Sequence, residues 1–262
     1  MAGDTAGDTA GGTTRVQEGS AVSDATGLGV IGSLLRLAPC RVVDVGGGTG
    51  VWAVPLAQAG CEVVVVDPSP NSLAALARRA GEAGVSERVT GVQGDVDSLL
   101  GPEPSRAVTD RAAELVLAHG VLEVVDDVPT ALRALGGLLS PGGVLSVLVS
   151  CRAGTALQRA VSGRLEESRH ILDDPDGRSG PSDILLRRFD VAELTEQLTG
   201  AGLEVVAVRG DGVLADLLPA AVREATSATG LAELEQTAAA SPALGMVATS
   251  RLHLLVRRPD AG

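Results

Sequence analysis

The glycine turn at residues 46–50 constrains the fold of this chain more than any other feature of its sequence. Residues 42–45 form a short apolar run that is typical of a buried parallel strand, and residues 51–59 are predicted to form a helix. Glycine adopts positive φ and allows a ligand to touch bare backbone. The helix N-terminus adds free N–H groups and a partial positive charge. The strand, turn and helix together predict a nucleotide-binding edge.

The spacing of the glycines separates the classes of nucleotide. They fall at positions 46, 48 and 50, and Val51 occupies the place of the third glycine in the dinucleotide fingerprint Gly-x-Gly-x-x-Gly. A Walker phosphate loop requires Gly-Lys-Ser/Thr, and the chain contains no lysine. The sequence therefore disfavours an NAD-binding oxidoreductase and excludes a Walker-type nucleotide site.

The Gly-x-Gly-x-Gly pattern, preceded by Asp44, resembles motif I of the class I S-adenosylmethionine (SAM) methyltransferases. The resemblance implies SAM as the cofactor, with the acidic residue facing its methionine ammonium group. It also implies that the glycines pack beneath the cofactor, namely Gly46, Gly47, Gly48 and Gly50. The alternative is a glycine turn that binds nothing.

A second acidic residue follows at the expected distance. Residues 61–66 are largely apolar and end in Asp67, which lies 17 positions beyond Gly50. A carboxylate roughly 20 residues past the glycine turn, at the end of the second strand, reaches the ribose hydroxyls. Asp67 can instead begin the turn that contains Pro68, with Ser69 or Asn71 capping the next helix, and it can do both.

The rest of the chain alternates between apolar runs and helical periodicity. We expect further strands at residues 88–92, 113–118, 144–150, 203–208 and 251–256. Helices are expected at 73–83, 128–139, 190–198 and much of 214–240. A turn is expected at 140–143, and a loop or short irregular helix at 99–110. This pattern predicts an α/β fold with a doubly wound, seven-stranded, mostly parallel, Rossmann-like sheet whose last strand is antiparallel. Asp190 is expected to cap the helix that follows it.

The chain divides into a tail and one methyltransferase domain. Residues 1–25 repeat Ala-Gly-Asp-Thr and are too polar to stay ordered, so we expect a disordered tail, with a helix over the cofactor cleft at 26–37. Residues 26–262 form the domain. Within it, residues 152–189 interrupt the alternation, and in the resembled fold such an insertion caps the acceptor pocket.

Two further stretches are candidates for the site. The resemblance implies that the loop Gly94-Asp95-Val96 borders the adenine, with Asp95 the favoured carboxylate and a helix cap as the alternative. His119 ends the fourth predicted strand, where ligands of open α/β sheets bind, although a core histidine is the plainer interpretation. The pattern that amine methyltransferases use at this place, Asn/Asp-Pro-Pro-Tyr/Phe, is missing, so methylation of an exocyclic amine is disfavoured.

Residues 41–258 resemble the bacterial tRNA 5-carboxymethoxyuridine methyltransferases more closely. The resemblance rests on residues 119–123, the Pro-Gly-Gly strand at 141–146, the arginine-bearing insertion, and residues 231–235 and 252–257. That family carries an arginine in a Gly-Val-Arg segment after the sixth strand, which can pair with the acceptor carboxylate. Here the segment ends in Leu214, so Arg209 is the candidate for that contact.

Composition limits the partners. The net charge is −12, which argues against nonspecific nucleic-acid binding but permits a local basic patch of Arg152, Arg159, Arg187 and Arg188. Three scattered cysteines predict a reducing, cytoplasmic location and no metal site, and no apolar run is long enough to span a membrane.

The sequence therefore predicts a SAM-dependent methyltransferase that acts on an oxygen acceptor, with a carboxylate on a tRNA wobble uridine as the first candidate. A small-molecule O-methyltransferase is the alternative, and a SAM-binding module without turnover is a third. A carboxylate is ionised near neutral pH and needs no base. A hydroxyl acceptor would need one, and His119 is the candidate imidazole.

Overall fold

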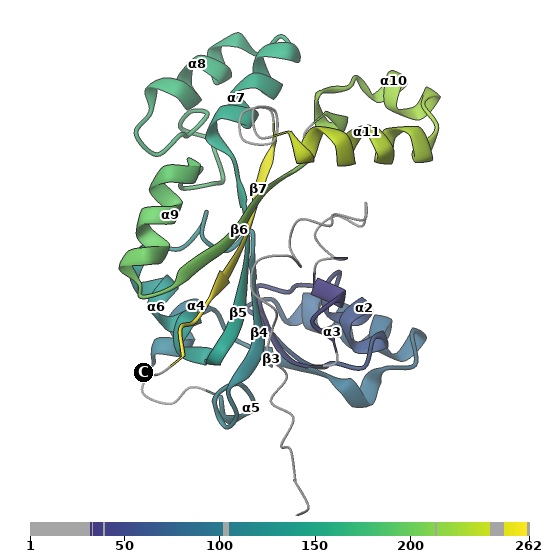
Figure 1. The fold of residues 1–262 in the computed structure, drawn as a ribbon, viewed down its shortest axis with the longest axis vertical. Coiled ribbons are helices and arrows are strands. Elements are labelled where there is room, and N and C mark those ends of the chain that lie inside the picture. The colour runs from purple at the N-terminus through teal and green to yellow at the C-terminus, as the bar shows by residue number, and fades with distance from the viewer. Residues whose placement is uncertain are drawn as a thin grey trace, which may run out of the picture.

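A seven-stranded sheet organises the chain (Figure 1). The computed structural model describes residues 32, 34–38, 40–101, 105–212, 214–241 and 249–260. The predicted tail at 1–25 lies outside these residues, as does most of the helix predicted at 26–37. The strands are β1 (Arg41–Val45), β2 (Glu62–Asp67), β3 (Val89–Gln93), β4 (Ala113–His119), β5 (Leu139–Ser150), β6 (Glu204–Asp211) and β7 (Arg251–Arg257).

The strand order confirms the predicted fold class. The sheet runs β3-β2-β1-β4-β5-β7-β6, and β7 is antiparallel to both of its neighbours while the other pairs are parallel. The order reverses between β1 and β4, because β2 and β3 continue to one side of β1 and the later strands to the other. In open α/β sheets this switch point is where ligands bind.

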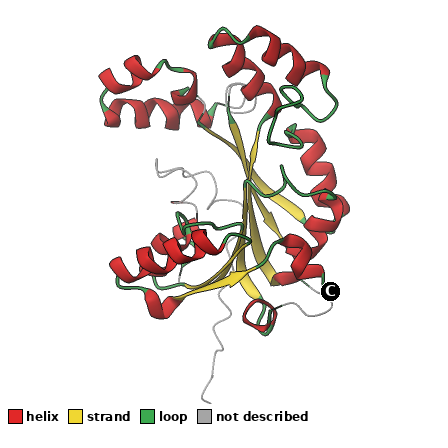
Figure 2. Ribbon diagram, turned by 180° about the vertical axis from the view of Figure 1, so that it is seen from behind, coloured by secondary structure: helices red, strands yellow, loops and turns green. Residues whose placement is uncertain are grey.

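Helices cover both faces of the sheet (Figures 1 and 2). One face carries α2 (Ala53–Gln58) and α3 (Pro70–Glu82), with the short η1 (Ser86–Arg88) leading into β3. The other carries α4 (Val96–Leu100), α6 (Val128–Leu138) and α9 (Val191–Gly200). The short α5 (Arg106–Thr109) precedes β4.

Alternate residues of each strand enter separate cores on the two faces. Val42 packs with the α2–α3 core and Val43 with the α6–α9 core. Because side chains alternate along a strand, Asp44 lies on the face of Val42. The cores consist mainly of leucine, valine and alanine, and Phe189 is fully buried in the second of them.

The remaining helices lie beyond the carboxyl ends of the parallel strands (Figure 1). After β5 come α7 (Arg152–Val161) and α8 (Leu165–Asp173); between β6 and β7 come η2 (Ala215–Leu217), α10 (Ala220–Ala225) and α11 (Ala228–Ala240). An isolated bridge between Cys151 and Phe189 joins the two ends of the 152–189 insertion. The insertion thus leaves and re-enters the sheet at one point.

Three local predictions can be compared in detail with the structure. Residues 140–143, predicted as a turn, belong to β5, which starts at Leu139 opposite Ala113 and crosses a register shift with Gly142 at φ +72°. The stretch 99–110, expected as a loop or a short irregular helix, holds the end of α4 and the short α5. Asp190 lies at the N-cap position of α9 without a capping hydrogen bond, because its carboxylate pairs with Arg152 at 3.7 Å.

Candidate functional site

The carboxyl ends of β1, β2 and β4 lie side by side at the switch point. Val45 pairs with Val66 of β2 on one side and with Ala118 of β4 on the other. The residues that follow these positions therefore meet at one edge of the sheet. The structure thus brings the predicted glycine turn, Asp67 and His119 together there.

The glycine turn bends tightly over the end of β1. Gly46 has φ +72°, and a Cβ atom placed on it would lie 2.7 Å from Cγ2 of Val121. A Cβ on Gly47 would lie 2.5 Å from Cγ of Asp44. A larger side chain at either position would therefore displace Val121, Asp44 or the turn itself, so a substitution such as Gly46→Val would disturb the fold as well as a bound ligand.

Asp67 connects two loops of the site. Its Oδ2 accepts a hydrogen bond from the backbone N–H of Gly48, and its Oδ1 accepts one from Ser69, each at 2.9 Å. Ser69 also caps α3 by accepting from Ser72 at 3.2 Å. The turn role that the sequence offered for Asp67 is thus present. Each carboxylate oxygen keeps a second acceptor position, so a contact with a ribose remains a prediction.

Asp44 is a buried carboxylate without a hydrogen-bond partner among the described residues. Only 1% of the residue is exposed, and burial, followed by repulsion from Asp67, raises its pKa to about 7. Leaving such a group unpaired is costly, so the arrangement is suited to a ligand that brings a cation. The ammonium group of SAM meets that requirement.

The loop predicted to border the adenine, residues 94–96, already makes contacts within the protein. Asp95 accepts from Ser98 N–H at 2.8 Å, and Ser98 Oγ accepts from Asp95 N–H at 2.9 Å, which forms a capping box at the start of α4. Val96 is buried, and Gly94 N–H donates to the Asp67 carbonyl at 3.2 Å. The helix-cap alternative for Asp95 is therefore present, and the exposed Pro68 lies in the loop opposite.

His119 is partly buried and belongs to a polar cluster with the buried Ser146 and His253. Its Nε2 lies 2.8 Å from Oγ of Ser146, which lies 2.9 Å from Nε2 of His253. The ring of Trp52 contacts His119 edge-on, with centroids 4.9 Å apart. Burial, followed by the charges of His253 and Arg251, lowers the pKa of His119 to about 3. The imidazole is therefore neutral at neutral pH.

His253 is a residue that the sequence did not connect with His119. It lies within β7, and the pairing of β5 with β7 brings it next to Ser146. No sequence signal gives that register. Arg209 lies opposite His253 in the β6–β7 pair. Among the described residues its guanidinium makes no hydrogen bond or ion pair, and burial, then Arg36, lowers its pKa.

The four arginines expected to form a basic surface are engaged within the protein. Arg188 is buried and pairs with Asp183 at 2.6 Å, and Arg159 pairs with Glu167 at 3.2 Å. The other two are held similarly: Arg187 donates to backbone carbonyls that include that of Leu122, and Arg152 pairs with Asp190. These four side chains therefore already have partners among the described residues, and a basic surface that binds an acceptor stays a prediction.

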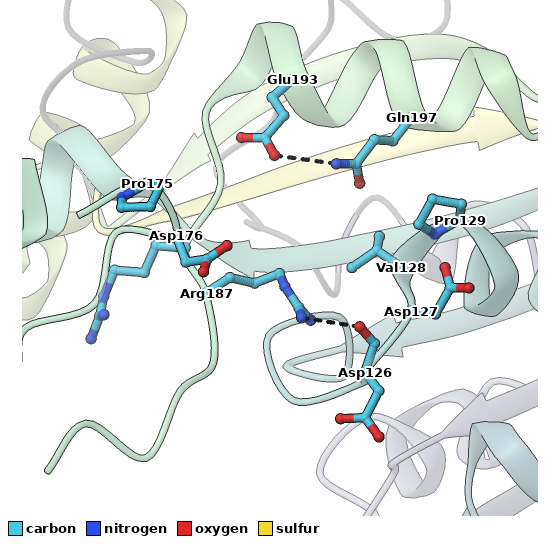
Figure 3. Close-up of a pocket in the computed structure, with 10 residues that line it drawn as sticks. Asp126, Asp127, Val128, Pro129, Pro175, Asp176, Arg187, Glu193 and Gln197 are labelled. Carbon is cyan, nitrogen blue, oxygen red and sulfur yellow. Dashed lines mark hydrogen bonds between the residues drawn. The ribbon is translucent and has the colours of Figure 1, made fainter. Parts of the chain in front are cut away.

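Two cavities lie near the carboxyl edge. One, of about 380 Å³, is lined by residues including Ser150, Thr155, Arg159 and Arg251, and lies between the 152–189 insertion and the start of β7. Arg251 pairs with Ser150, so this cavity lies at the carboxyl end of β5. The other, of about 270 Å³, lies between α6 and α9, on the face opposite α2 and α3 (Figure 3).

Within the described part of the chain, no group of three or more His, Cys, Asp and Glu residues is placed to hold a metal ion. None of the described helices has the length and apolar character needed to cross a membrane.

The fold and this edge define a class I, Rossmann-like SAM-binding domain. Residues 28–208, more than half of the chain, match the family model described as a methyltransferase domain. The chain belongs to this methyltransferase family, and the family and fold together imply SAM as its cofactor. They show a SAM-dependent methyltransferase domain, as the resemblance predicted.

The relatives differ in acceptor. The chain is 28% identical over 198 residues to a tRNA 5-carboxymethoxyuridine methyltransferase of Escherichia coli K12, covering 74% of this chain and 71% of the relative. It is 34% identical over 131 residues to a ubiquinone biosynthesis O-methyltransferase of Azorhizobium caulinodans, covering 50% of this chain and only 48% of the relative. A SAM-dependent methyltransferase structure from Mesorhizobium loti superposes with a TM-score of 0.55 at 20% identity, covering 86% and 96% of the two chains, which shows the fold.

Gly48→Ala tests the glycine turn more selectively than Gly46→Val. A Cβ on Gly48 meets only Asp67 Oδ2 and the Gly46 carbonyl oxygen, at 3.8 and 4.0 Å, but φ of +55° strains an alanine. We expect SAM affinity to fall about threefold to tenfold, because strain of about 1 kcal/mol moves the turn that carries the ligand. Isothermal titration with SAM measures the change.

Gly84→Ala is the matched control, because Gly84 has φ +70° and nothing within 4 Å of its Cβ position. Both variants should lose similar stability, while only Gly48→Ala should lose affinity. Equal SAM affinities in the two variants would exclude the glycine turn from the cofactor site.

Proposed function

We propose that this chain transfers a methyl group from SAM to an oxygen of a small, carboxylate-bearing acceptor. The observation that carries the proposal is Arg209, a partly buried guanidinium without a hydrogen bond or ion pair among the described residues, on the face of the sheet that holds His119. A guanidinium matches a carboxylate with two parallel hydrogen bonds.

The cofactor half of the site rests on three groups. Asp44 supplies a carboxylate to an ammonium, Asp67 has acceptor positions left for a diol, and the turn at Gly48 brings backbone close to both. When bound, SAM supplies an electrophilic methyl group. The protein's own contribution is to hold the acceptor oxygen in line with it and to exclude water.

The acceptor half needs alignment more than proton transfer. A carboxylate is already ionised near neutral pH, so no base has to remove a proton. Arg209 is our candidate for holding that carboxylate. His119 is neutral near neutral pH, so it carries no positive charge that would compete with Arg209 for the carboxylate. A cavity of about 380 Å³ lies beside Arg251, two residues before His253 on β7.

A small acceptor agrees better with the charges than a tRNA does. The net charge is −12, and four arginines of the insertion, Arg152, Arg159, Arg187 and Arg188, are already engaged within the protein. Phosphate contacts would have to come from elsewhere. A tRNA carboxylate remains the second candidate, because the relative from E. coli aligns over most of both chains. Such binding should be weak and should decrease as salt rises.

A labelled-SAM transfer assay on bulk tRNA, beside a pool of small acids and phenols, tests the proposal. We expect label in the small acids, reduced in Arg209→Ala by about tenfold to a hundredfold in kcat/KM, because a charged hydrogen-bond pair is lost. Arg78→Ala is the control, since Arg78 is an exposed residue of α3 whose ion pair, within the part of the chain that the structure describes, is with Glu82.

Label in the tRNA fraction that is lost in Arg209→Ala would favour the second candidate. Label in phenols alone would indicate a hydroxyl acceptor and return His119 to the role of base. SAM binding without transfer to any acceptor would indicate a binding module without turnover.

A further inference from the structure

Three polar side chains cross the sheet beneath the proposed acceptor site. His119 pairs with Leu148 of β5, and Leu148 pairs with His253 of β7. Ser146 lies two residues before Leu148 and therefore points to the same face of the sheet. The hydrogen-bonding distances of 2.8 and 2.9 Å make a continuous chain from His119 through Ser146 to His253.

Ser146 and His253 are buried and His119 is partly buried, so the hydrogen bonds between them are largely shielded from water. Ser146 is 0% exposed and His253 is 3% exposed. Burial lowers the pKa of both imidazoles, to about 3 for His119, where His253 and Arg251 add to the effect, and to about 4 for His253, where Arg209 adds to it. Both rings are therefore neutral near neutral pH, and each carries one N–H proton.

The number of available protons links the tautomers of the His119 and His253 rings. Two hydrogen bonds converge on the hydroxyl of Ser146, and this hydroxyl has one proton to donate. If Ser146 donates to His119, then Nε2 of His253 must donate to Ser146. If Ser146 donates to His253, then Nε2 of His119 must donate. A third arrangement, in which both rings donate to Ser146, would leave the proton of this fully buried hydroxyl without an acceptor among the described residues. In the two arrangements that pair this proton, one ring is protonated at Nε2 and the other at Nδ1.

We propose that Ser146 and His253 are positioning residues that hold His119 in the tautomer opposite to that of His253. The free end of the chain is Nδ1 of His119, a buried atom with no hydrogen-bond partner among the described residues. This inference rests on the proposed function, because the acceptor is the partner that completes the chain. An ionised carboxylate requires Nδ1–H on His119, and a hydroxyl requires the bare nitrogen.

A purely structural role explains the cluster less well. Buried polar groups can be replaced by packed apolar residues at little cost or with a gain in stability. Here the cluster lies in a sheet whose neighbouring positions, Leu117, Leu148 and Leu254, are buried leucines. It also leaves one of its own nitrogen atoms unsatisfied, which is expected of a group that awaits a ligand.

Nitrogen NMR of the unmodified protein with ¹⁵N-labelled histidine tests the inference directly. The protein has three histidines. His170→Gln removes the signals of His170, which lies on the exposed surface of α8. We expect two neutral rings near neutral pH, one protonated at Nδ1 and the other at Nε2. Two rings in the same tautomer, or a charged ring, would overturn the proposal.

Ser146→Ala should uncouple the rings, whereas Ser140→Ala should not. Ser140 is a serine of the same strand whose hydroxyl donates to the Ala113 carbonyl at 3.2 Å, at the opposite edge of the sheet. We expect Ser146→Ala and His253→Gln to lower kcat by about tenfold, with KM for SAM unchanged. Unchanged kcat and unchanged His119 signals in Ser146→Ala would contradict a positioning role.

The NMR measurement does not depend on turnover. Opposite tautomers without methyl transfer would leave the hydrogen-bonded chain standing and refute the proposed function. Transfer activity with identical tautomers would refute only the hydrogen-bonded chain of His119, Ser146 and His253.

Discussion

Replacing Asp67 by alanine is expected to weaken SAM binding by more than about tenfold. The carboxylate is proposed to accept from the ribose hydroxyls, and a hydrogen bond to a charged group contributes about 1.5–3 kcal/mol. The structure adds a second cause, because Asp67 also accepts from the backbone N–H groups of Gly48 and Ser69. Isothermal titration with SAM measures the total loss.

Asp67→Asn separates the two causes. An asparagine oxygen can still accept from one backbone N–H group, whereas its amide cannot accept from a diol. We expect Asp67→Asn to retain more stability than the alanine variant but to lose affinity nearly as strongly. Glu87→Ala removes an exposed carboxylate of η1 and should leave affinity unchanged. Wild-type affinity in Asp67→Asn would refute the ribose contact.

Replacing Asp44 by asparagine should have opposite effects on stability and on binding. Without a ligand, the substitution removes a buried carboxylate with no hydrogen-bond partner among the described residues, so the melting temperature at pH 8 should rise by at least about 2 °C. SAM affinity should fall by more than about tenfold, because a neutral amide cannot pair with an ammonium group. Thermal unfolding and SAM titration measure the two effects.

The pH dependence of stability follows from the pKa of Asp44. Burial and Asp67 raise this pKa from 3.8 to about 7, so between these values the folded state binds more protons than the unfolded state. The contribution of Asp44 to the free energy of unfolding therefore decreases as pH rises through this window and is constant above it. Its upper bound is about 4 kcal/mol.

SAM binding should show the reverse dependence, since the ammonium pairs with the ionised carboxylate. Affinity should decrease by about tenfold for each pH unit below the pKa of about 7 in the free protein. Asp44→Asn should remove this dependence together with the slope in stability. A stability difference between wild type and variant that is the same at pH 5 and pH 8 would contradict the assignment.

Elements whose signals are local were predictable from the sequence. The glycine turn and the buried valine runs gave β1, β2 and their loops, because glycine and parallel strands carry strong local signatures. Asp44 and Asp67 lie at the predicted edge, although the sequence did not show that Asp44 would be unpaired and Asp67 would hold two loops. Those facts depend on packing between segments.

The remainder of the site depends on long-range pairing. Ser146 joins two histidines only because β7 enters the sheet antiparallel between β5 and β6, and a shift of one residue would turn His253 to the other face. The arginines of the insertion looked like a basic patch because a charge count does not show partners. Arg188 and Asp183, five positions apart, are both nearly buried by their pairing.

The antiparallel pairing of β6 with β7 also bears on how acceptor preference can change. Adjacent antiparallel strands need a connection of only about two residues. Here residues 212–250 form the connection and carry α10 and α11 beyond the carboxyl ends of the sheet (Figure 1). The β6–β7 hairpin would close without α10 and α11. The connection between the two strands should therefore be replaceable by the equivalent segment of a relative, without a change at the switch point between β1 and β4.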